Sequence, residues 1–236
     1  NAKGHLTFAG TDTVELAKNH GTPLYVLDEK MEFVSGLAGI LPGKKIKSIK
    51  FIGENAYFVA GGDSEKTVII DISDPSKPVA AGSISTEGFS HELYMLSETK
   101  LLGASVDSDG STVISLFDVS DAANPKTVAS YKLESNFRIP CADDTRCVMI
   151  DADKKIFGLP IVDANPASET EISAYILFDV SQGIAPMGTY THDTAYTGDA
   201  AVRGICIDNA LYTVSGERVV AFSVENCTVI SSQAIR

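Results

Sequence analysis

The chain alternates short apolar runs with polar turns, and one such pattern recurs along it. In the clearest copy, the apolar run Val68–Ile70 ends on Asp71, and a Ser-Asp-Pro turn leads through Pro78 into a second apolar run. Another copy ends on Asp118. Short runs of β-branched and aromatic residues between turn residues are typical of β-strands. The pattern therefore predicts a chain built almost entirely of short strands.

The last residue of the recurring strand, which we call the pivot, marks the register of the repeat. The pivots are Asp28, Asp71, Asp118, Asp179 and Ser223, and successive pivots lie 43, 47, 61 and 44 residues apart. A strand-built period in the forties indicates a propeller blade, and each repeat divides into four predicted strands, as a blade does. The sequence therefore predicts an all-β fold, a β-propeller of about five four-stranded blades.

The predicted blades form a single domain over residues 1–236, with approximate bounds 1–43, 44–87, 88–134, 145–190 and 200–236. The first blade is incomplete, because Gly4–Gly10, Pro23–Leu27 and Phe33–Leu37 supply three strands and no segment supplies a fourth. Either the ring closes imperfectly or the chain is a piece of a larger propeller, and we favour the second interpretation.

Aspartate stands at four of the five pivots, once per blade. A site carboxylate has no reason to recur in this way, whereas aspartate side chains stabilise tight turns. We therefore interpret the pivots as turn-forming residues. Function is expected instead in what does not repeat, above all in the two insertions of the fourth repeat, Glu134–Arg146 and Asp163–Glu171. Tolerated surface loops are the favoured interpretation of the insertions themselves.

Composition narrows the function classes. The chain has 31 acidic and 19 basic residues and a net charge of −12, which argues against nucleic-acid binding, because a phosphate backbone requires a concentrated basic surface. The longest apolar runs have the length of strands, so no membrane-spanning helix is predicted.

Four cysteines are present, without a Cys-x-x-Cys pair. Cys141 and Cys147 flank a short polar turn and are predicted to form a disulfide, which favours an oxidising, extracellular setting. Whether Cys206 and Cys227 are free is left open.

The pattern of a strand followed by Asp-x-Ser-Asp-Pro-x-x-Pro resembles the LVIVD repeat of bacterial surface propellers. The agreement extends along the chain, through Leu24–Glu29, Ile46–Gly53, Ser115–Asp121 with Asn124–Lys126, and Ala210–Ser215. The chain is similar to secreted bacterial proteins that contain a C-terminal β-propeller domain, distantly akin to WD-repeat proteins. The resemblance implies a propeller fold and an extracellular or surface-anchored location. It carries no functional residues, because that family has no assigned activity.

A second resemblance concerns only the first part of the chain. Gly4–Gly10, Thr13–Lys18 and Gly21–Asp28 resemble the opening of diaminopimelate decarboxylases. Those enzymes need a barrel of alternating strands and helices, and the sequence after residue 31 does not have that pattern. We therefore set this alternative aside.

The densest mixture of chemically active side chains precedes the fifth blade, in a predicted loop. It contains the candidate ligand-binding residues His192, Asp193, Tyr196 and Asp199, with Arg203 just beyond. Histidine beside carboxylates can bind metal or transfer protons. His91 begins the third blade, so His91, His192 and Arg203 are catalytic candidates if they converge at the centre of the ring. A solvent-exposed loop next to a strand is the competing interpretation.

Asp107 and Asp109 lie in an Asp-Ser-Asp-Gly segment whose oxygens suit a hard cation such as calcium. The segment lacks the later acidic ligand of a full calcium loop, and Asp-Gly between strands is a common hairpin turn. A turn is the favoured interpretation, and no other cofactor is predicted.

No nucleophile triad or phosphate-binding loop is present in the sequence. The leading hypothesis is an interaction scaffold that binds a protein or a glycan. The alternatives are a hydrolase or lyase that acts on an extracellular polymer at the central channel, and a calcium-stabilised structural module. The identity of the ligand and the oligomeric state stay open.

Overall fold

The computed structural model describes residues 6–9, 21–61, 66–85, 89–107, 109–134, 137–139, 145–163, 172–195 and 203–235. This part of the chain is β-strand and turn with one short 3-10 helix, and none of its helices is long and apolar enough to span a membrane. The chain divides into two compact units. Unit 1 comprises Asn1–Ser105 and Phe117–Thr127, and unit 2 comprises Val106–Leu116 and Val128–Arg236.

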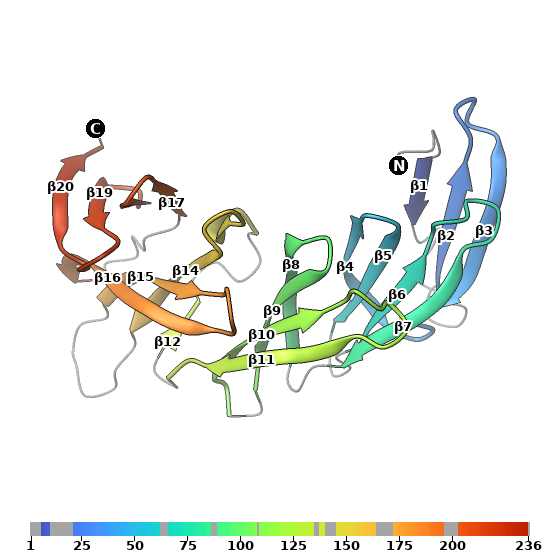
Figure 1. Ribbon diagram of the computed structural model, residues 1–236, viewed down its shortest axis with the longest axis horizontal. Helices are drawn as coiled ribbons and strands as arrows, with labels where there is room; N and C mark the ends of the chain where they lie inside the picture. Colours follow the sequence, from blue (N-terminus) through green and yellow to red (C-terminus); the bar gives the residue numbers. More distant parts are fainter. Residues whose placement is uncertain are drawn as a thin grey trace. The chain divides into compact units, whose positions relative to one another are not determined.

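Five sheets follow one another along the sequence (Figure 1). Sheet 1 has the order β1-β2-β3, with bounds Leu6–Ala9, Thr22–Leu27 and Phe33–Ile40. Sheet 2 has the order β4-β5-β6-β7, with bounds Lys45–Ile52, Asn55–Gly61, Lys66–Asp71 and Val79–Ser85. Sheet 3 consists of β8-β9-β10-β11, with bounds Phe89–Ser97, Lys100–Val106, Thr112–Asp118 and Lys126–Lys132.

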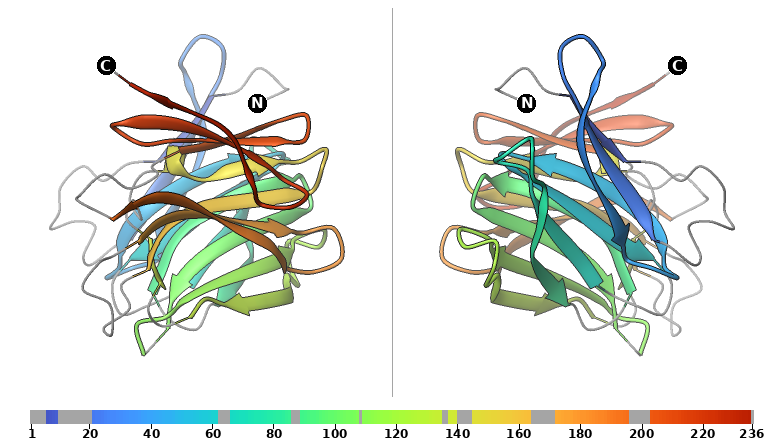
Figure 2. Two further views of the ribbon diagram at one scale, coloured as in Figure 1. Left: turned by 90° about the vertical axis from the view of Figure 1, so that its left-hand side faces the viewer. Right: turned by 90° about the vertical axis from the view of Figure 1, so that its right-hand side faces the viewer.

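Sheet 4 has the order β12-β14-β15-β16, with bounds Phe137–Arg138, Ile156–Asp163, Ile172–Asp179 and Ala185–Ala195. The short strand β13, Met149–Asp151, also pairs with β14 and follows the 3-10 helix Thr145–Cys147. Sheet 5 has the order β17-β18-β19-β20, with bounds Arg203–Ile207, Ala210–Val214, Arg218–Ser223 and Val229–Ala234. Figure 2 shows the strands of each sheet side by side.

The predicted fold class is confirmed. Each repeat of the sequence contains one sheet, and the first sheet has three strands, as the incomplete first repeat predicts. Sheet 4 differs from the predicted fourth blade in two of its strands. Its strand β12 was not predicted, because two residues have no periodicity to detect. Its last strand runs on to Ala195, past the predicted end at Tyr190, because β16 pairs with β15 again at Ala195 and Ile172, beyond a shift in register.

The inner sheets bury both faces, because neighbouring residues of a strand point to opposite sides. In β5, Ala56, Phe58 and Ala60 belong to a cluster with sheet 1, whereas Tyr57 and Val59 belong to a cluster with sheet 3. This double burial explains why the strand is a nearly unbroken apolar run rather than an alternation of apolar and polar residues.

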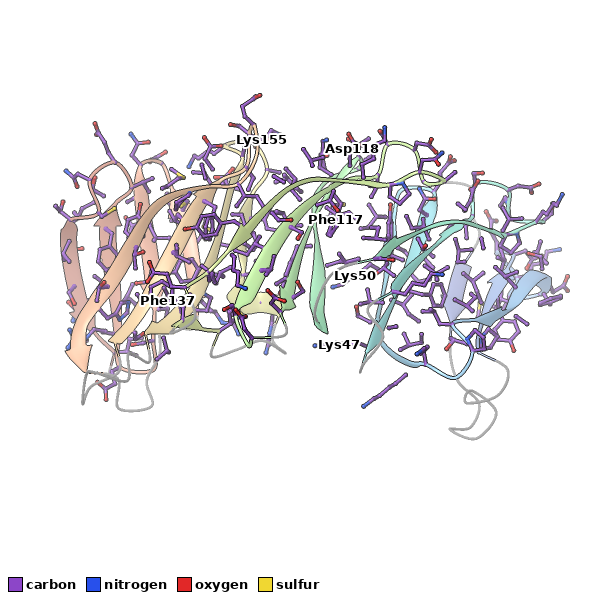
Figure 3. The ribbon with its side chains drawn as sticks, turned by 90° about the horizontal axis from the view of Figure 1, so that it is seen from below. Lys47, Lys50, Phe117, Asp118, Phe137 and Lys155 are labelled. Atoms are coloured by element: carbon purple, nitrogen blue, oxygen red, sulfur yellow. The ribbon has the colours of Figure 1, made fainter. Side chains whose placement is uncertain are left out.

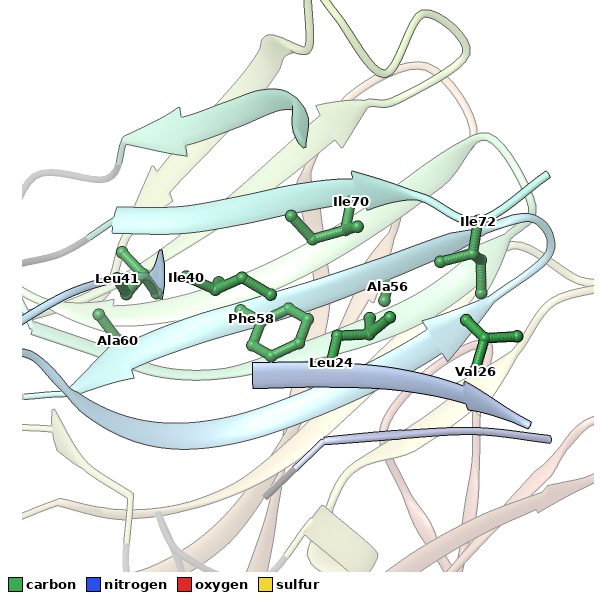
Figure 4. Close-up of a cluster of buried hydrophobic side chains, with 9 residues drawn as sticks. All are labelled: Leu24, Val26, Ile40, Leu41, Ala56, Phe58, Ala60, Ile70 and Ile72. Atoms are coloured by element: carbon green, nitrogen blue, oxygen red, sulfur yellow. The ribbon is translucent and has the colours of Figure 1, made fainter. Parts of the chain in front are cut away.

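Two of these clusters illustrate the packing. Sheets 1 and 2 share the cluster in Figure 4, which comprises Leu24, Val26, Ile40, Leu41, Ala56, Phe58, Ala60, Ile70 and Ile72. Sheets 4 and 5 share a cluster within unit 2, which comprises Met149, Ile156, Tyr175, Leu177, Tyr190, Leu211, Val220 and Phe222. Each cluster draws on two successive sheets, so a sheet is held by its neighbour rather than by a core of its own.

The aspartate pivots form Asx turns. The carboxylate Oδ1 accepts a hydrogen bond from the backbone N–H two residues on, at 2.8 Å for Asp28, 2.8 Å for Asp71, 3.0 Å for Asp118 and 2.7 Å for Asp179. In Figure 3, Asp118 lies at the end of β10 next to the buried Phe117. The interpretation of the pivots as turn-forming residues is therefore confirmed.

Hydrogen bonding at these turns also changes the acidity of the pivots. The ammonium of Lys100, 2.7 Å from Asp118, and then the hydroxyl of Ser120 hold the pKa of the Asp118 carboxyl well below its usual range. Bonds from Ser181 lower the pKa of Asp179. Asp118 and Asp179 are therefore negatively charged acceptors at neutral pH.

The turn that follows the pivot, which we call the exit turn, is tied back to its own sheet. The residue after the pivot donates its backbone N–H to a carbonyl in the sheet's first hairpin, at N–O distances of 2.8 to 2.9 Å. The donor–acceptor pairs are Ile72–Glu54, Val119–Thr99, Val180–Lys155 and Val224–Asn209. The same bond thus recurs in sheets 2 to 5 and fixes the position of each exit turn.

The exit turn also contacts the outer strand of the preceding sheet, and we call this contact the latch. In sheet 1, the Ser35 hydroxyl donates to the carbonyl of Pro75 at 2.6 Å. The corresponding position of sheet 2 is Gly82, where a Cβ would lie well under 3.0 Å from the carbonyl oxygen of Ala122. Ser35 and Gly82 each directly follow a β-bulge in the outer strand. The latch therefore joins equivalent positions.

The latch recurs in unit 2. In sheet 4, Gly188 follows the bulge of β16, and a Cβ there would collide with Sγ of Cys227. In sheet 3, Ala129 Cβ lies 3.8 Å from the place where a Cβ of Gly183 would stand. The residues that dock on the preceding sheet all stand four positions after their pivot: Pro75, Ala122, Gly183 and Cys227.

We expect Gly82→Ala to lower the free energy of unfolding by about 1–3 kcal/mol, because the added methyl group forces the backbone of the exit turn away from β7. Urea denaturation measures the loss. Gly183→Ala is the matched control, because a Cβ at Gly183 meets only Ala129 at ordinary contact distance. Equal stability of the two variants would contradict the latch.

Candidate functional site

A groove opens in unit 1 between β3 of sheet 1 and the outer strands of sheet 2. Its volume is about 400 Å³. One wall is Leu37–Leu41, and the other consists of Lys66, Val68 and Ile70 from β6 with Ala80–Ser83 from β7.

The groove follows from local sequence. The latch between Ser35 and Pro75 holds the start of β3 against sheet 2. Beyond it, one wall carries Ala38 and Gly39, and the other wall carries Ala80, Ala81 and Gly82. Because these side chains are small, they leave a furrow between the strands.

Both walls include a strand at the edge of its sheet. β3 ends the order of sheet 1 and β7 ends the order of sheet 2, so each strand has one side without a partner in its own sheet. An edge strand presents N–H and C=O groups that can pair with an added extended segment. The groove therefore has a largely apolar lining that includes residues of two edge strands.

The groove is lined by few types of side chain. Of the residues that line the groove, Lys66 alone is charged, and none is aromatic. Sugars commonly bind by stacking on aromatic rings, which this lining does not offer. The arrangement suits an extended segment with small apolar side chains and an acidic group opposite Lys66.

His192 lies in strand β16, so its prediction as a loop residue is wrong. Its side chain is only 3% exposed. The ring Nε2 lies 2.6 Å from Oγ1 of Thr213 in β18, and the ring centroid is 6.2 Å from that of Phe222. The strand continues through this residue because its pairing with β15 extends to Ile172 and Ala195. His192 is thus a hydrogen-bonded residue buried between sheets 4 and 5.

The other members of the predicted constellation are described only in part. Arg203 begins β17, and its Nη1 donates to the carbonyl oxygen of Arg146 at 3.1 Å. Tyr196 and Asp199 lie outside the described residues, as do the side chains of His91 and Asp193. A common ligand-binding or catalytic site for these residues stays a prediction.

The turn at Asp107 and Asp109 is confirmed. The N–H of Asp107 donates to the carbonyl of Ser111 at 2.8 Å, and Gly110 adopts a φ of 85°. Lys132 reaches both carboxylates, with its Nζ 2.6 Å from Asp107 Oδ2 and 2.8 Å from Asp109 Oδ2. Lys132 therefore provides, next to both carboxylates, the positive charge that a calcium ion would provide in the calcium hypothesis.

A hydrogen bond from Lys132 has the largest effect on the acidity of Asp109. This bond, followed by bonds from Ser111, lowers the pKa of Asp109 to about 2. In the part of the chain that the structure describes, no group of three or more His, Cys, Asp or Glu side chains is arranged to hold a metal.

Cys147 is disulfide-bonded, whereas Cys206 and Cys227 are free. Cys141 lies outside the described residues, so its pairing with Cys147 stays a prediction. Cys206 and Cys227 lie at the margin of the cluster between sheets 4 and 5, where burial raises the pKa of the Cys206 thiol.

Sequence reasoning missed the groove, because its residues belong to ordinary strands. A signal was present in the run Ala80-Ala81-Gly82-Ser83, which is unusually small for a strand. Small residues in an outer strand leave backbone uncovered, but only the position of the neighbouring sheet reveals the space that results.

A family model described as "Beta propeller domain" matches residues 1–227. An uncharacterized protein of Methanocaldococcus jannaschii is 30% identical over 192 residues, which are 81% of this chain and 28% of that protein. An uncharacterized protein of Archaeoglobus fulgidus is 30% identical over 196 residues, 83% of this chain and 29% of that protein. The chain thus spans less than a third of these curated relatives. The family model supports the predicted propeller, whereas the LVIVD repeat and the likeness to secreted bacterial proteins stay predictions, since both relatives are archaeal.

A chain in the crystal structure of the mitotic checkpoint complex shares the fold, with a TM-score of 0.53 and 15% sequence identity over 89% of this chain and 57% of that one. The local resemblance to diaminopimelate decarboxylases is confirmed. The enzyme of Methanothermobacter thermautotrophicus is 66% identical over 29 residues, 12% of this chain. This match is too short to imply a barrel fold, and the described residues form successive antiparallel sheets instead.

We expect Thr213→Val to lower the free energy of unfolding by about 1–3 kcal/mol, because Nε2 of His192 loses its buried hydroxyl partner while the shape of the side chain is kept. Urea denaturation provides the measurement. Thr213→Ser retains the hydroxyl and should stay much nearer to the wild type. Valine and serine variants of equal stability would count against a structural role for this pair.

We expect Lys132→Met to raise the pKa of Asp109 from about 2 towards 3.8, the ordinary value. The depressed pKa means that the ion pair stabilises the fold above pH 3.8 and loses its effect as the pH falls towards 2. Carboxyl chemical shifts measured by NMR follow the titration. Lys126→Met, on the same strand, should leave Asp109 unchanged, and an unshifted Asp109 in Lys132→Met would refute the assignment.

Proposed function

The chain belongs to the Beta propeller domain family, and on that premise we propose that it is an interaction module that binds an extended segment of a partner protein. The observation that carries the proposal is the groove of about 400 Å³ between β3 and β7. Its two edge strands would hold the partner by main-chain hydrogen bonds, in the manner of β-strand addition.

Side-chain recognition would come from the floor and one end of the groove. Ala38, Ala80 and Ala81 offer small apolar surface, and alternate side chains of an extended segment can point towards it. Lys66 is exposed and can pair with a carboxylate of the bound segment. The proposed ligand is therefore an extended peptide with small apolar residues and at least one acidic residue.

A protein ligand is favoured over a glycan. The groove is lined by aliphatic residues and backbone, whereas sugar recognition usually relies on aromatic rings and dense polar groups. The relatives are much longer than the part of them that this chain matches. We therefore propose the module as one part of a larger interaction protein.

We also propose an extracellular or cell-surface location. The support is the disulfide at Cys147, since disulfides persist mainly in oxidising compartments.

We expect peptides selected from a random phage-displayed library on the wild-type chain to bind the groove. Ala38→Arg or Ala80→Arg places a long cationic side chain in it and should weaken the selected peptides by at least about tenfold, equivalent to about 1.4 kcal/mol. Fluorescence anisotropy with synthetic peptides measures the affinities. Lys66→Glu should weaken acidic peptides in particular.

The matched control is Val128→Arg, which adds the same group to an exposed outer-strand position of sheet 3, outside the groove. Peptides that bind all variants equally would place the site elsewhere. Failure to enrich any peptide would overturn the proposed function, and parallel screening on a glycan array distinguishes that outcome from carbohydrate binding.

A further inference from the structure

One position recurs in the outer strand of each sheet, and we call it the ring position. It pairs with the residue four places before the pivot, and it is Leu37 in β3, Ile84 in β7 and Tyr190 in β16. In all three strands it stands two residues after the latch position. By that rule Tyr131, two residues after Ala129, holds the ring position of β11.

In unit 2 the ring positions carry aromatic rings that pack on the next sheet. Tyr131 contacts Phe178, with ring centroids 5.2 Å apart and an interplanar angle of 62°. Tyr190 contacts Phe222, with centroids 5.6 Å apart and an angle of 69°. Phe178 and Phe222 each directly precede their pivot. Edge-to-face pairs of this kind are favourable, so two rings fill the space between an outer strand and the next sheet.

In unit 1 the corresponding pairs have fewer rings. Ile84 and Phe117 share the cluster between sheets 2 and 3, so one ring remains there. Leu37 and Ile70 are the corresponding residues between sheets 1 and 2, where both are aliphatic. Leu37 and Ile70 both line the groove. The groove therefore opens at the place where sheets 4 and 5 hold two aromatic rings.

The surface that the groove offers at this place suits a ring. Ile70 is fully buried, whereas Leu37 on one wall and Val68 on the other are half-buried and line the groove. An apolar cavity of about 150 Å³ is large enough for benzene. The groove, at about 400 Å³, therefore has room for an aromatic side chain together with part of the backbone that carries it.

The charged residue of the groove lies at a defined distance from this place. Lys66 and Val68 are two residues apart in β6 and share one face of the strand. An extended ligand that lies along β6 has the same spacing between alternate side chains. A side chain of the ligand opposite Val68 therefore has a neighbour, two residues away, opposite Lys66.

We propose that the segment bound in the groove is anchored by one aromatic side chain, inserted between Leu37 and Val68, with an acidic residue two positions away that pairs with Lys66. This inference rests on the proposed function and adds an aromatic residue to the small apolar residues of the ligand. The ligand's ring takes the place that the chain's own rings fill between sheets 4 and 5.

Two phage-displayed peptide libraries test the proposal, one with all residues varied and one without Phe, Tyr and Trp. Peptides that bind the groove, identified by their weaker binding to Ala80→Arg, should come from the first library and contain a ring two residues from an acidic residue. Replacing that ring by alanine in a synthetic peptide should weaken binding to the wild-type chain by at least about tenfold.

Fluorescence reports the position of the ring, because the chain contains no tryptophan. A peptide whose ring is replaced by Trp should shift its emission to shorter wavelength on binding. Leu37→Tyr gives β3 the residue found in β11 and β16, and it should weaken this peptide by at least about tenfold because the space is filled. Gln233→Tyr is the matched control, since it adds the same ring at the exposed ring position of β20, outside the groove.

The acidic residue is tested by its position. Moving it by one place in the peptide turns it away from Lys66, which should weaken binding to the wild-type chain but not to Lys66→Met. Circular dichroism confirms that each variant is folded, and the alanine-substituted peptide tests the anchor on the wild-type chain alone.

The outcomes separate this inference from the proposed function. Groove-binding peptides of equal affinity from both libraries, or a Trp peptide whose emission does not shift, would overturn the aromatic anchor and leave the proposed function intact. If neither library yields a peptide that Ala80→Arg weakens, the proposed function is overturned, and the aromatic anchor with it.

Discussion

The latch between successive sheets is the constraint on which the rest of the structure depends. A sheet of this chain has too few strands to bury a core of its own, so it must be held against its neighbour. The pivot carboxylate shapes the exit turn, the following N–H ties that turn to its own sheet, and the residue four positions after the pivot docks on the preceding one. The small residue at Gly82 or Gly188 is required because a backbone or sulfur atom occupies the place of its Cβ.

This hierarchy explains why the fold could be predicted from the sequence. The period of the pivots and the apolar runs are direct consequences of sheets that stack on both faces, as in β5. The role of Asp28, Asp71, Asp118 and Asp179 followed from their recurrence, since a turn repeats with the blade whereas a site does not. Each of these signals is local in the sequence, so one chain without relatives was enough to identify it.

The candidate sites were far less accessible, because they depend on contacts between segments distant in sequence. His192 looked like a loop residue among polar neighbours, yet pairing with β15 carries the strand through it and places it against Thr213. Asp107 and Asp109 were correctly predicted to form a turn, but the sequence did not show that Lys132, on another strand, contacts both carboxylates. The groove joins β3 to β7, and its small apolar residues carry no sequence signature of binding.

Repetition also determines where binding surface remains. The faces of the inner sheets are buried against neighbouring sheets, and the exit turns contact the preceding sheet through the latch. Few of the side chains that recur in every blade are therefore available to a partner. What stays available in unit 1 includes the edge strands β3 and β7, each of which has one side without a partner in its own sheet. The groove is lined by these two strands, at positions where their side chains are small. Binding at the groove is therefore proposed where the repeat places small residues on outer strands, and not at the aspartates that recur with each blade.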